Sequence, residues 1–464
     1  MTKFPPFVRR KSTLIALACV GVLSAPLAVN AQTVYNYQDR DICGYGTCNL
    51  GFNGQGLTIQ FSVATGLSRV KSDGATTGDG TAAAPTASNA TPRNQVWTGL
   101  SWVRFSGSRL IGGDFIKSTA FHVETGINMD SGSSATSAGV LGTRNTAVGI
   151  DTSVGSFWAG KWTTPYNSST TTLNATSSSL GAGITYSGLM GSPGFGAGTS
   201  YNGNGNTGFG SSATAATAIS NSMSFGRTTP NTVHYLSPSY SGVQAHIGYA
   251  AAEETPAGAN PLTKPELWSG TLTYKNGPIY LGGAFEQHTD YLWGTAMGAN
   301  QFGAGSANVG AGTSSKDKGY KLLGSYTFGN TFISAIWEKL NYTQSGNVTG
   351  FTGLSRNAWY LGLKQTISGP HSVAASYMRA GSYSCTSATT AACDTSDSGA
   401  TFWTLNYSYA VDKYTKLVAS YGRMSNDRRG AYNAGGVSFV ASGATANTAG
   451  STQQSYSVGI SSSF

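Results

Sequence analysis

Short segments in which apolar and polar residues alternate recur along the chain from residue 57 to its end. Alternation with a period of two is the pattern of a β-strand whose two faces meet different surroundings. The connections alternate too: tight turns, such as those at Gly277, Gly329 and Gly369, are separated by long tracts rich in Gly, Ser, Thr and Asn. Short turns at one end and long loops at the other predict an all-β chain whose antiparallel strands run up and down in sequence order.

Sixteen segments carry this strand pattern, an even number of the kind that single-chain bacterial barrels use. They lie near 57–68, 95–106, 115–127, 144–152, 155–162, 228–237, 241–251, 267–275, 278–288, 317–327, 330–342, 356–367, 370–381, 400–410, 413–425 and 453–464.

Charged side chains are scarce in this chain. Asp, Glu, Lys and Arg make up 10% of its residues, against about 25% in soluble domains. Lipid on one face of every strand would explain this, because Arg or Lys at mid-depth costs about 2–4 kcal/mol, and an open sheet edge cannot be satisfied in hydrocarbon. We therefore predict a closed, 16-stranded antiparallel transmembrane β-barrel in a Gram-negative outer membrane. A secreted sandwich or solenoid is the alternative, with more surface charge and less regular turns.

The first 31 residues predict an export signal that is cleaved. A basic start that includes Arg9 and Arg10 precedes an apolar stretch and the small residues that end at Ala31. Cys19 raises the alternative of a lipid anchor, but the apolar run continues well past it. The predicted organisation is therefore a signal peptide at 1–31, an N-terminal extension at 32–56 and a barrel at 57–464.

Net charge and cysteines limit the partners of the exported chain. The whole chain has 28 basic and 19 acidic residues, and removing the four bases of the signal leaves 24 minus 19, or +5. This modest charge, without a Lys/Arg run, argues against a nucleic-acid partner. The other cysteines fall into two local pairs, which predict two disulfide loops, although four cysteines allow three connectivities and a metal site is the rival interpretation. The pairs are Cys43 with Cys48 and Cys385 with Cys393.

Aromatic residues and the last strand also fit a barrel. Tyr456, Val458, Ile460 and the terminal Phe464 share one face, and a Phe-terminated apolar strand resembles the C-terminal signature of outer-membrane barrels. Six tryptophans near strand ends or outer faces are candidates for the aromatic girdles of such barrels. They are Trp97, Trp158, Trp162, Trp337, Trp359 and Trp403.

Several stretches resemble general porins of the β-proteobacterial type. Residues 107–132 (GSRLIGGDFIKSTAFHVETGINMDSG), 144–150 (RNTAVGI), 155–166 (GSFWAGKWTTPY), 227–238 (RTTPNTVHYLSP) and 409–421 (YAVDKYTKLVASY) match family segments in order and spacing. The resemblance implies a homotrimer of sixteen-stranded barrels that admits small hydrophilic solutes. It also implies a long constriction loop, from about 163 to 226, that folds into the lumen.

The chain departs from that family at several points. Arg109 stands where an acidic residue is usual, Lys161 where Arg is usual, and the last residues lack the usual basic and His residues before Phe464. None of the 64 residues from 163 to 226 is charged. Loop carboxylates that face wall arginines are therefore missing, and a basic wall would bias the pore toward anions.

Six residues are predicted to line the pore. Strand parity turns Arg104 inward, and places Lys161 in the lumen if Trp158 and Trp162 form a girdle. His122 and Glu124 are the inward choice on their strand, and Arg144 and Arg227 follow from the resemblance. The alternative is that these bases are solvated charges at the rim. The predicted pore-lining residues are Arg104, His122, Glu124, Arg144, Lys161 and Arg227.

The sequence predicts an outer-membrane porin for passive diffusion, with weak anion preference, that contacts outer-membrane lipid and small hydrophilic solutes and ions. A solute-selective channel and a non-conducting structural or adhesive barrel are the alternatives. We expect no enzyme activity, cofactor or metal, because His-Glu-x-x-His and Gly-x-Ser-x-Gly motifs are missing and the five His are dispersed.

Overall fold

The computed structural model describes residues 55–74, 92–99, 101–127, 141–176, 189–194, 224–251, 265–291, 293, 308–309, 312–388, 394–432 and 449–464. The predicted signal peptide lies outside these residues, as does the N-terminal extension up to residue 54. Cys43, Cys48 and Cys393 also lie outside them. Cys385 is disulfide-bonded, and its pairing with Cys393 stays a prediction.

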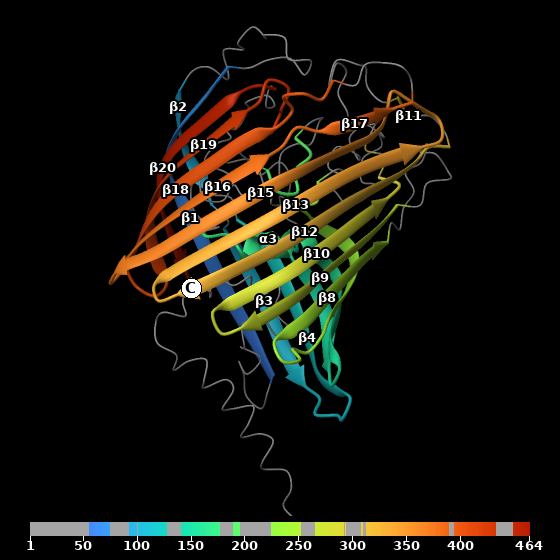
Figure 1. The fold of residues 1–464 in the computed structure, drawn as a ribbon. Helices are drawn as coiled ribbons and strands as arrows, with labels where there is room; N and C mark the ends of the chain where they lie inside the picture. The colour runs from blue at the N-terminus through green and yellow to red at the C-terminus, as the bar shows by residue number, and fades with distance from the viewer. Residues whose placement is uncertain are drawn as a thin grey trace, which may run out of the picture.

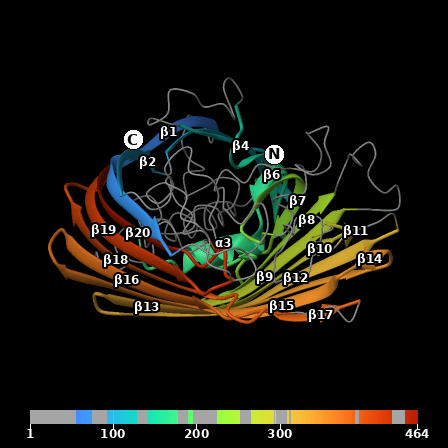
Figure 2. The same cartoon turned by 90° about the horizontal axis from the view of Figure 1, so that it is seen from above.

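Sixteen antiparallel strands follow one another around a closed barrel (Figures 1 and 2), which confirms the predicted fold. The first and last strands close it, from the pair Ser62 and Ser463 to the pair Asp73 and Thr452. The barrel strands are β1 (Gln55–Asp73), β3 (Trp102–Leu110), β4 (Ile116–Gly126), β5 (Thr146–Thr152), β6 (Gly155–Thr163), β7 (Thr228–Leu236), β8 (Val243–Ala251), β9 (Glu266–Asn276), β10 (Ile279–Thr289), β12 (Ser314–Phe328), β13 (Thr331–Ser345), β15 (Phe351–Ser368), β16 (His371–Ala380), β18 (Ala400–Ala410), β19 (Thr415–Asn426) and β20 (Thr452–Ser463).

Four short strands and one helix complete the described structure. Two of the strands extend the barrel wall: β2 (Arg93–Thr98) pairs with β1, and β17 (Ser384–Ser387) pairs with β15. β11 (Asn308–Val309) and β14 (Val348–Thr349) form a separate two-stranded sheet. Within the described residues, no helix combines the length and apolar character needed to cross a membrane.

The predicted strand at 95–106 is divided into β2 and β3, which corrects the sequence-based boundary. Ser101 interrupts it by taking over the pairing of Ala64 on β1. Its Oγ accepts a hydrogen bond from Ala64 N at 2.9 Å and donates one to Ala64 O at 3.2 Å. The Ser101 side chain therefore takes the place of a backbone acceptor for the Ala64 N–H, while Ala64 O also accepts from Gly99 N at 2.6 Å.

The predicted tight turns are confirmed. Gly277, Gly329 and Gly369 each have φ of +52°, a left-handed conformation that glycine adopts without a steric penalty. Each joins two long neighbouring strands, so these turns lie at one end of the barrel. The long tracts of the sequence connect strands at the other end.

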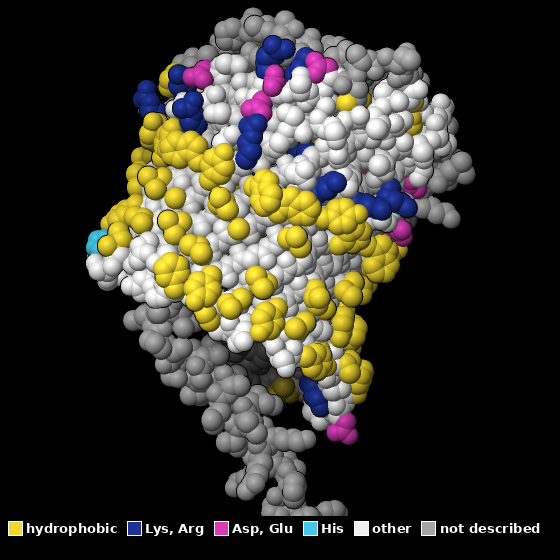
Figure 3. All heavy atoms as spheres, in the orientation of Figure 1, with side chains coloured by type: hydrophobic (Ala, Val, Ile, Leu, Met, Phe, Trp, Pro, Cys, Tyr) yellow, Lys and Arg dark blue, Asp and Glu magenta, His cyan; other side chains and the backbone are white. Residues whose placement is uncertain are grey.

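Aromatic side chains lie next to one another on the outer face of the long strands, from β13 to β19. Neighbouring strands contribute ring pairs in contact, such as Trp337 with Trp359 at 6.4 Å between centroids and Trp403 with Tyr421 at 4.9 Å. Figure 3 shows two hydrophobic bands on this face, with basic side chains gathered beyond the band nearer the long loops. Trp337, Trp359 and Trp403 therefore belong to the outer face, as predicted.

The other three tryptophans lie on the inner face, and the girdle prediction is wrong for them. Trp97 packs over Gly66 and Gly459, where a Cβ would lie within 2.5 and 2.6 Å of its ring. Trp158 stacks on His234, with centroids 5.3 Å apart, and Trp162 packs against His122. Parity alone cannot distinguish an aromatic residue that faces lipid from one that packs against inward-facing side chains.

Candidate functional site in the barrel lumen

A buried carboxylate, Glu124, organises the first charged network of the inner wall. Arg104 Nη2 donates to Glu124 Oε2 at 2.8 Å, and Arg144 Nε donates to its other oxygen. Arg104 also donates to Gln60 at 3.1 Å, and His122 Nε2 lies 3.6 Å from the carboxylate. The Glu124 side chain is 0% exposed. This network, which we call the wall network, links β1, β3, β4 and the residue stretch before β5.

The structure thus brings together four of the predicted residues, Arg104, His122, Glu124 and Arg144, on the inner face. Charge-assisted hydrogen bonds are stronger than neutral ones, and a buried carboxylate without such partners would be unstable. Their contact with permeating solutes is not part of this geometry and stays a prediction.

Lys161 is the exception among the predicted residues. Lys161 on β6 pairs with Thr146 on β5. Two residues along the same strands, Ala159 pairs with Val148, and both of these are exposed on the outer face. Because alternate residues of a strand share a face, Lys161 lies on the outer face, and its prediction as a lumen residue is wrong. Its Nζ donates to Thr143 O at 2.7 Å. The prediction failed because the tryptophans beside it face inward.

Arg227 lies apart from the wall network, just before β7. Its guanidinium carbon lies 5.0 Å from the centre of the Tyr291 ring. Its backbone oxygen accepts from Thr164 N at 3.2 Å. This backbone hydrogen bond joins the two ends of the β6–β7 connection. The Arg227 residue is 9% exposed.

The described parts of that connection lie against the inner wall. Its helix α3 (Pro165–Thr172) begins at Thr164, whose side chain accepts from Asn167 N, and has Pro165 in its first turn. Both residue types are typical of helix starts. In the view down the barrel, α3 lies inside the ring of strands (Figure 2).

A second network, the latch network, holds this connection to the long strands. Glu338 on β13 lies 3.7 Å from Lys321 on β12 and 3.3 Å from Arg356 on β15. The same carboxylate accepts from Tyr166 OH at 3.0 Å and from Gly191 N at 2.9 Å. Glu338 is 0% exposed.

The two bases of the latch network also bind the connection directly. Lys321 Nζ donates to Tyr166 O at 2.9 Å and to Thr170 Oγ1. Arg356 Nη2 donates to Leu189 O at 2.8 Å and to Ser192 O. Both charged wall residues therefore donate directly to the backbone of the connection, in addition to their contacts with Glu338.

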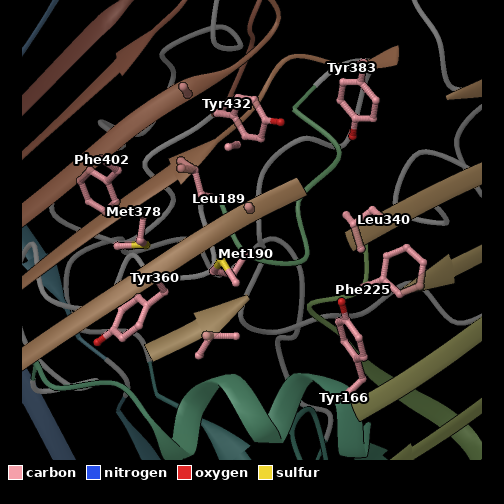
Figure 4. Packing of buried hydrophobic residues seen from close by; sticks show 14 of the residues in the cluster. Tyr166, Leu189, Met190, Phe225, Leu340, Tyr360, Met378, Tyr383, Phe402 and Tyr432 are labelled. Atoms are coloured by element: carbon pink, nitrogen blue, oxygen red, sulfur yellow. The ribbon is translucent and has the colours of Figure 1, made fainter. Parts of the chain in front are cut away.

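An apolar cluster adds to this attachment (Figure 4). Tyr166, Leu173, Leu189, Met190 and Phe225 from the β6–β7 connection are fully buried against wall residues. The wall contributes Leu340, Tyr342, Tyr360, Met378 and Phe402, among others. Tyr360 OH also accepts from Ala175 N at 2.8 Å. Polar and apolar contacts together hold the described parts of the connection inside the barrel.

Further histidines lie on the inner face near the connection. His288 Nε2 lies 2.9 Å from Glu286 Oε1 and its Nδ1 lies 3.9 Å from Asp317, while His234 and His246 share a 3.0 Å contact. Among the described residues, no group of three His, Cys, Asp or Glu side chains is arranged to hold a metal ion.

Sequence reasoning missed the latch network, although a signal for it existed. Trp359 and Leu361 on β15 are exposed on the outer face, so parity places Arg356 and Lys364 inward. The same parity places Glu338 inward beside Trp337 and Lys321 inward beside Leu322. Applying the parity argument to the long strands would have found these residues.

Two lysines stand apart from both networks. Lys364 on β15 and Lys416 on β19 face inward by the alternation of their strands, near the tight turns. Within the part of the chain that the structure describes, neither has an acidic partner in an ion pair. Among the described residues, no acidic side chain therefore compensates their charge.

Comparisons with known proteins agree with this fold. The sequence model of the Gram-negative porin family matches residues 14–430. The chain is similar to the anion-selective porin from Comamonas acidovorans, with 20% identity over 88% of this chain and 100% of that one, and a TM-score of 0.59. It is also similar to the trimer form of OmpT from Vibrio cholerae, with 14% identity over 88% and 99% of the two chains and a TM-score of 0.54. No curated protein matches the chain.

Proposed function

The chain belongs to the Gram-negative porin family, and on that premise we propose that it forms a water-filled channel across the outer membrane with a weak preference for anions. Small hydrophilic solutes would cross by passive diffusion, without a catalytic step. The anion-selective porin of similar fold supports the sign of the preference.

The observation that carries the anion preference is the pair of unpaired inward bases, Lys364 and Lys416. In both charged networks each central glutamate meets two bases. The sequence from 163 to 226 supplies no acidic residue. A pore wall with uncompensated positive charge concentrates anions and repels cations.

A reversal-potential measurement tests this proposal. The refolded protein is inserted into a planar bilayer with a tenfold salt gradient, and Lys364→Gln/Lys416→Gln is compared with the wild type. We expect an anion-biased potential in the wild type and a shift toward zero in the variant. Cation preference in the wild type would contradict the proposed anion preference, but not the proposal that the protein is a channel.

We also propose that the whole β6–β7 connection narrows the lumen as a constriction loop. The attachment of its described parts at the latch network supports this. A second candidate, a solute-selective channel, is favoured by the aromatic residues among those parts, such as Tyr166 and Phe225. Saturable block of the current by one solute would distinguish it from a general diffusion pore.

We propose a homotrimer as the assembly, supported by the trimer form of the similar Vibrio protein. Light scattering of the detergent-solubilised protein should give three chains per particle, and a single chain would contradict this.

We further propose that the protein is a channel and not an enzyme. If the purified, folded protein steadily hydrolysed an ester substrate, that statement would be overturned.

A further inference from the structure

The segment at 189–194 of the β6–β7 connection is held from two sides. On one side it binds to the latch network. On the other side, Tyr383 OH donates to Pro193 O at 2.7 Å. Ala431 N donates to Gly194 O at 2.9 Å. Tyr383 and Ala431 lie outside the barrel strands, in the connections that follow β16 and β19 at the long-loop end.

The ring of Tyr432 covers Gly194 and leaves no room there for a side chain. A Cβ on Gly194 would overlap this ring, and φ of Gly194 is +71°, a conformation that glycine adopts without a steric penalty. Asn426 fixes the backbone of Tyr432 through two hydrogen bonds, of 2.8 and 2.9 Å. Tyr383 and Tyr432 lie at the opposite end of the apolar cluster from Tyr166 in the view of Figure 4.

The two connections that carry these tyrosines also bind each other. Arg429, after β19, forms an ion pair with Asp394, which precedes β18. The Arg429 guanidinium donates to Ser396 Oγ at 2.7 Å, and its backbone N donates to Asp397 O at 2.7 Å. The connections therefore act as one unit, which we call the collar. Its described residues are 381–388, 394–399 and 427–432.

A disulfide lies beside Tyr383 in the collar. Cys385, two residues farther along, is disulfide-bonded. Thr395 Oγ1 lies 3.7 Å from Cys385 Sγ and donates to Tyr383 O. Ser398 Oγ accepts from Tyr383 N at 2.8 Å. The chain on the return to β18 thus holds Tyr383 on both sides of its peptide unit. With Cys393 as its predicted partner, the disulfide limits how far these two stretches can separate.

We propose that the collar positions the β6–β7 connection from the exterior side of the pore, with Tyr383 as a positioning residue that the disulfide at Cys385 supports. This inference rests on the proposal that the connection narrows the lumen. Among the described residues, the backbone oxygens of Pro193 and Gly194 donate their acceptor capacity to the collar alone. A segment that is attached on two sides cannot rotate about either attachment. Without the collar it would hang from the latch network and swing into the path of the current.

The first test opens the disulfide in a channel that already conducts. A water-soluble trialkylphosphine is added to a planar bilayer that contains the wild type. The disulfide is reduced to two thiols, and the phosphine becomes its oxide, with the oxygen and both thiol hydrogens supplied by water. We expect brief partial closures to appear within the same recording. Cys385→Ala/Cys393→Ala should show these closures from the start and should not respond to the phosphine.

The matched control for the reduction is Cys43→Ala/Cys48→Ala. It lacks the other predicted disulfide and keeps the one at Cys385, so its current should respond as that of the wild type does. A wild-type current that stays unchanged, although mass spectrometry shows Cys385 as a thiol, would overturn the proposal.

The second test is Tyr383→Phe, which keeps the ring and removes the hydrogen bond to Pro193. The time spent in partial closures should rise roughly 2- to 12-fold, the factor that corresponds to one net hydrogen bond of about 0.5–1.5 kcal/mol. Tyr235→Phe is the matched control, because Tyr235 OH also donates to a backbone oxygen, that of Val154, at 2.8 Å on the outer face. Its current should equal that of the wild type.

Glu338→Ala, recorded under the same conditions, separates two kinds of failure. If Glu338→Ala shows partial closures and Tyr383→Phe shows none beyond the wild type, the connection narrows the lumen but the collar does not position it. If neither variant changes the current, the proposal that the connection narrows the lumen is wrong as well.

Discussion

The wall network and the latch network use the same chemistry for different purposes. Both place one fully buried glutamate between two bases on the inner face. Among the described residues, Glu124 contacts the barrel wall and its strand ends alone, whereas Glu338 also accepts hydrogen bonds from Tyr166 and Gly191 of the β6–β7 connection. One network joins strands to each other, and the other joins a loop to strands.

Buried charge in a barrel can therefore position a loop as well as join strands. A charged pair in a low-dielectric interior contributes little net stability over apolar packing, but removal of one member is costly. Attachment of a loop through such a pair is therefore specific: the loop is held at one place, where its carbonyls and N–H groups find partners.

The largest expected effect comes from Glu338→Ala. This change leaves Lys321 and Arg356 without their shared acid and removes the acceptor for Tyr166 and Gly191. We expect a loss of about 3–5 kcal/mol in the free energy of unfolding. We also expect noisier single-channel current, because the connection loses its attachment. Urea unfolding and planar-bilayer recording measure the two effects.

Glu338→Gln is the control for that variant, since the amide keeps the shape and one acceptor oxygen. Its single-channel current should be less noisy than that of Glu338→Ala. Current noise equal to that of the wild type in a folded Glu338→Ala protein would show that the latch network does not hold the loop.

Glu124→Ala should have a somewhat smaller effect on stability. The change should cost about 3 kcal/mol, because Arg104 keeps its hydrogen bond to Gln60. We expect the current noise to stay at the wild-type level, since no described residue of the connection contacts Glu124. Noise as large as in Glu338→Ala would remove the distinction between the networks.

Tyr166→Phe tests a single contact of the latch network. Loss of its hydroxyl removes one hydrogen bond to a carboxylate, which is worth about 1.5–3 kcal/mol when buried. The ring and its packing against Phe225 remain. A double-mutant cycle with Glu338→Ala should give a coupling energy well above zero, and simple additivity would show that the hydroxyl acts independently of Glu338.

Asp412→Ala gives the smallest effect and serves as a reference outside both networks. Hydrogen bonds from the backbone N–H groups of Tyr414 and Thr415 hold the pKa of Asp412 below its usual value. Because the pKa of Asp412 is lower in the folded than in the unfolded protein, the ionised carboxylate stabilises the fold at pH values above the unfolded pKa, near pH 4. This stability is lost as the pH falls through the pKa of the folded protein. The variant should be less stable than the wild type at pH 7, and the difference should shrink at lower pH. A pH-independent difference would contradict this.

Much of the barrel could be predicted because its determinants are local. Fifteen of the predicted segments overlap a single barrel strand, and the segment at 95–106 overlaps two. The glycine turns lie where expected. Inward orientation of Arg104 followed from Val103 and Phe105 beside it. The site was less predictable: Lys161 was misplaced because Trp158 and Trp162 are inner-face residues whose partners, His234 and His122, come from other strands.

The strand periodicity, the turn positions, the apolar outer face and the scarcity of charge can all be read from the sequence. These features follow from the two-residue repeat of a strand and from the cost of charge in lipid. Which acid meets which base, which tryptophans turn inward and where the connection is held depend on how distant strands come together in the folded barrel. Tyr166 and Glu338 are 172 residues apart in sequence, and closure of the barrel is what brings such residues within hydrogen-bonding distance.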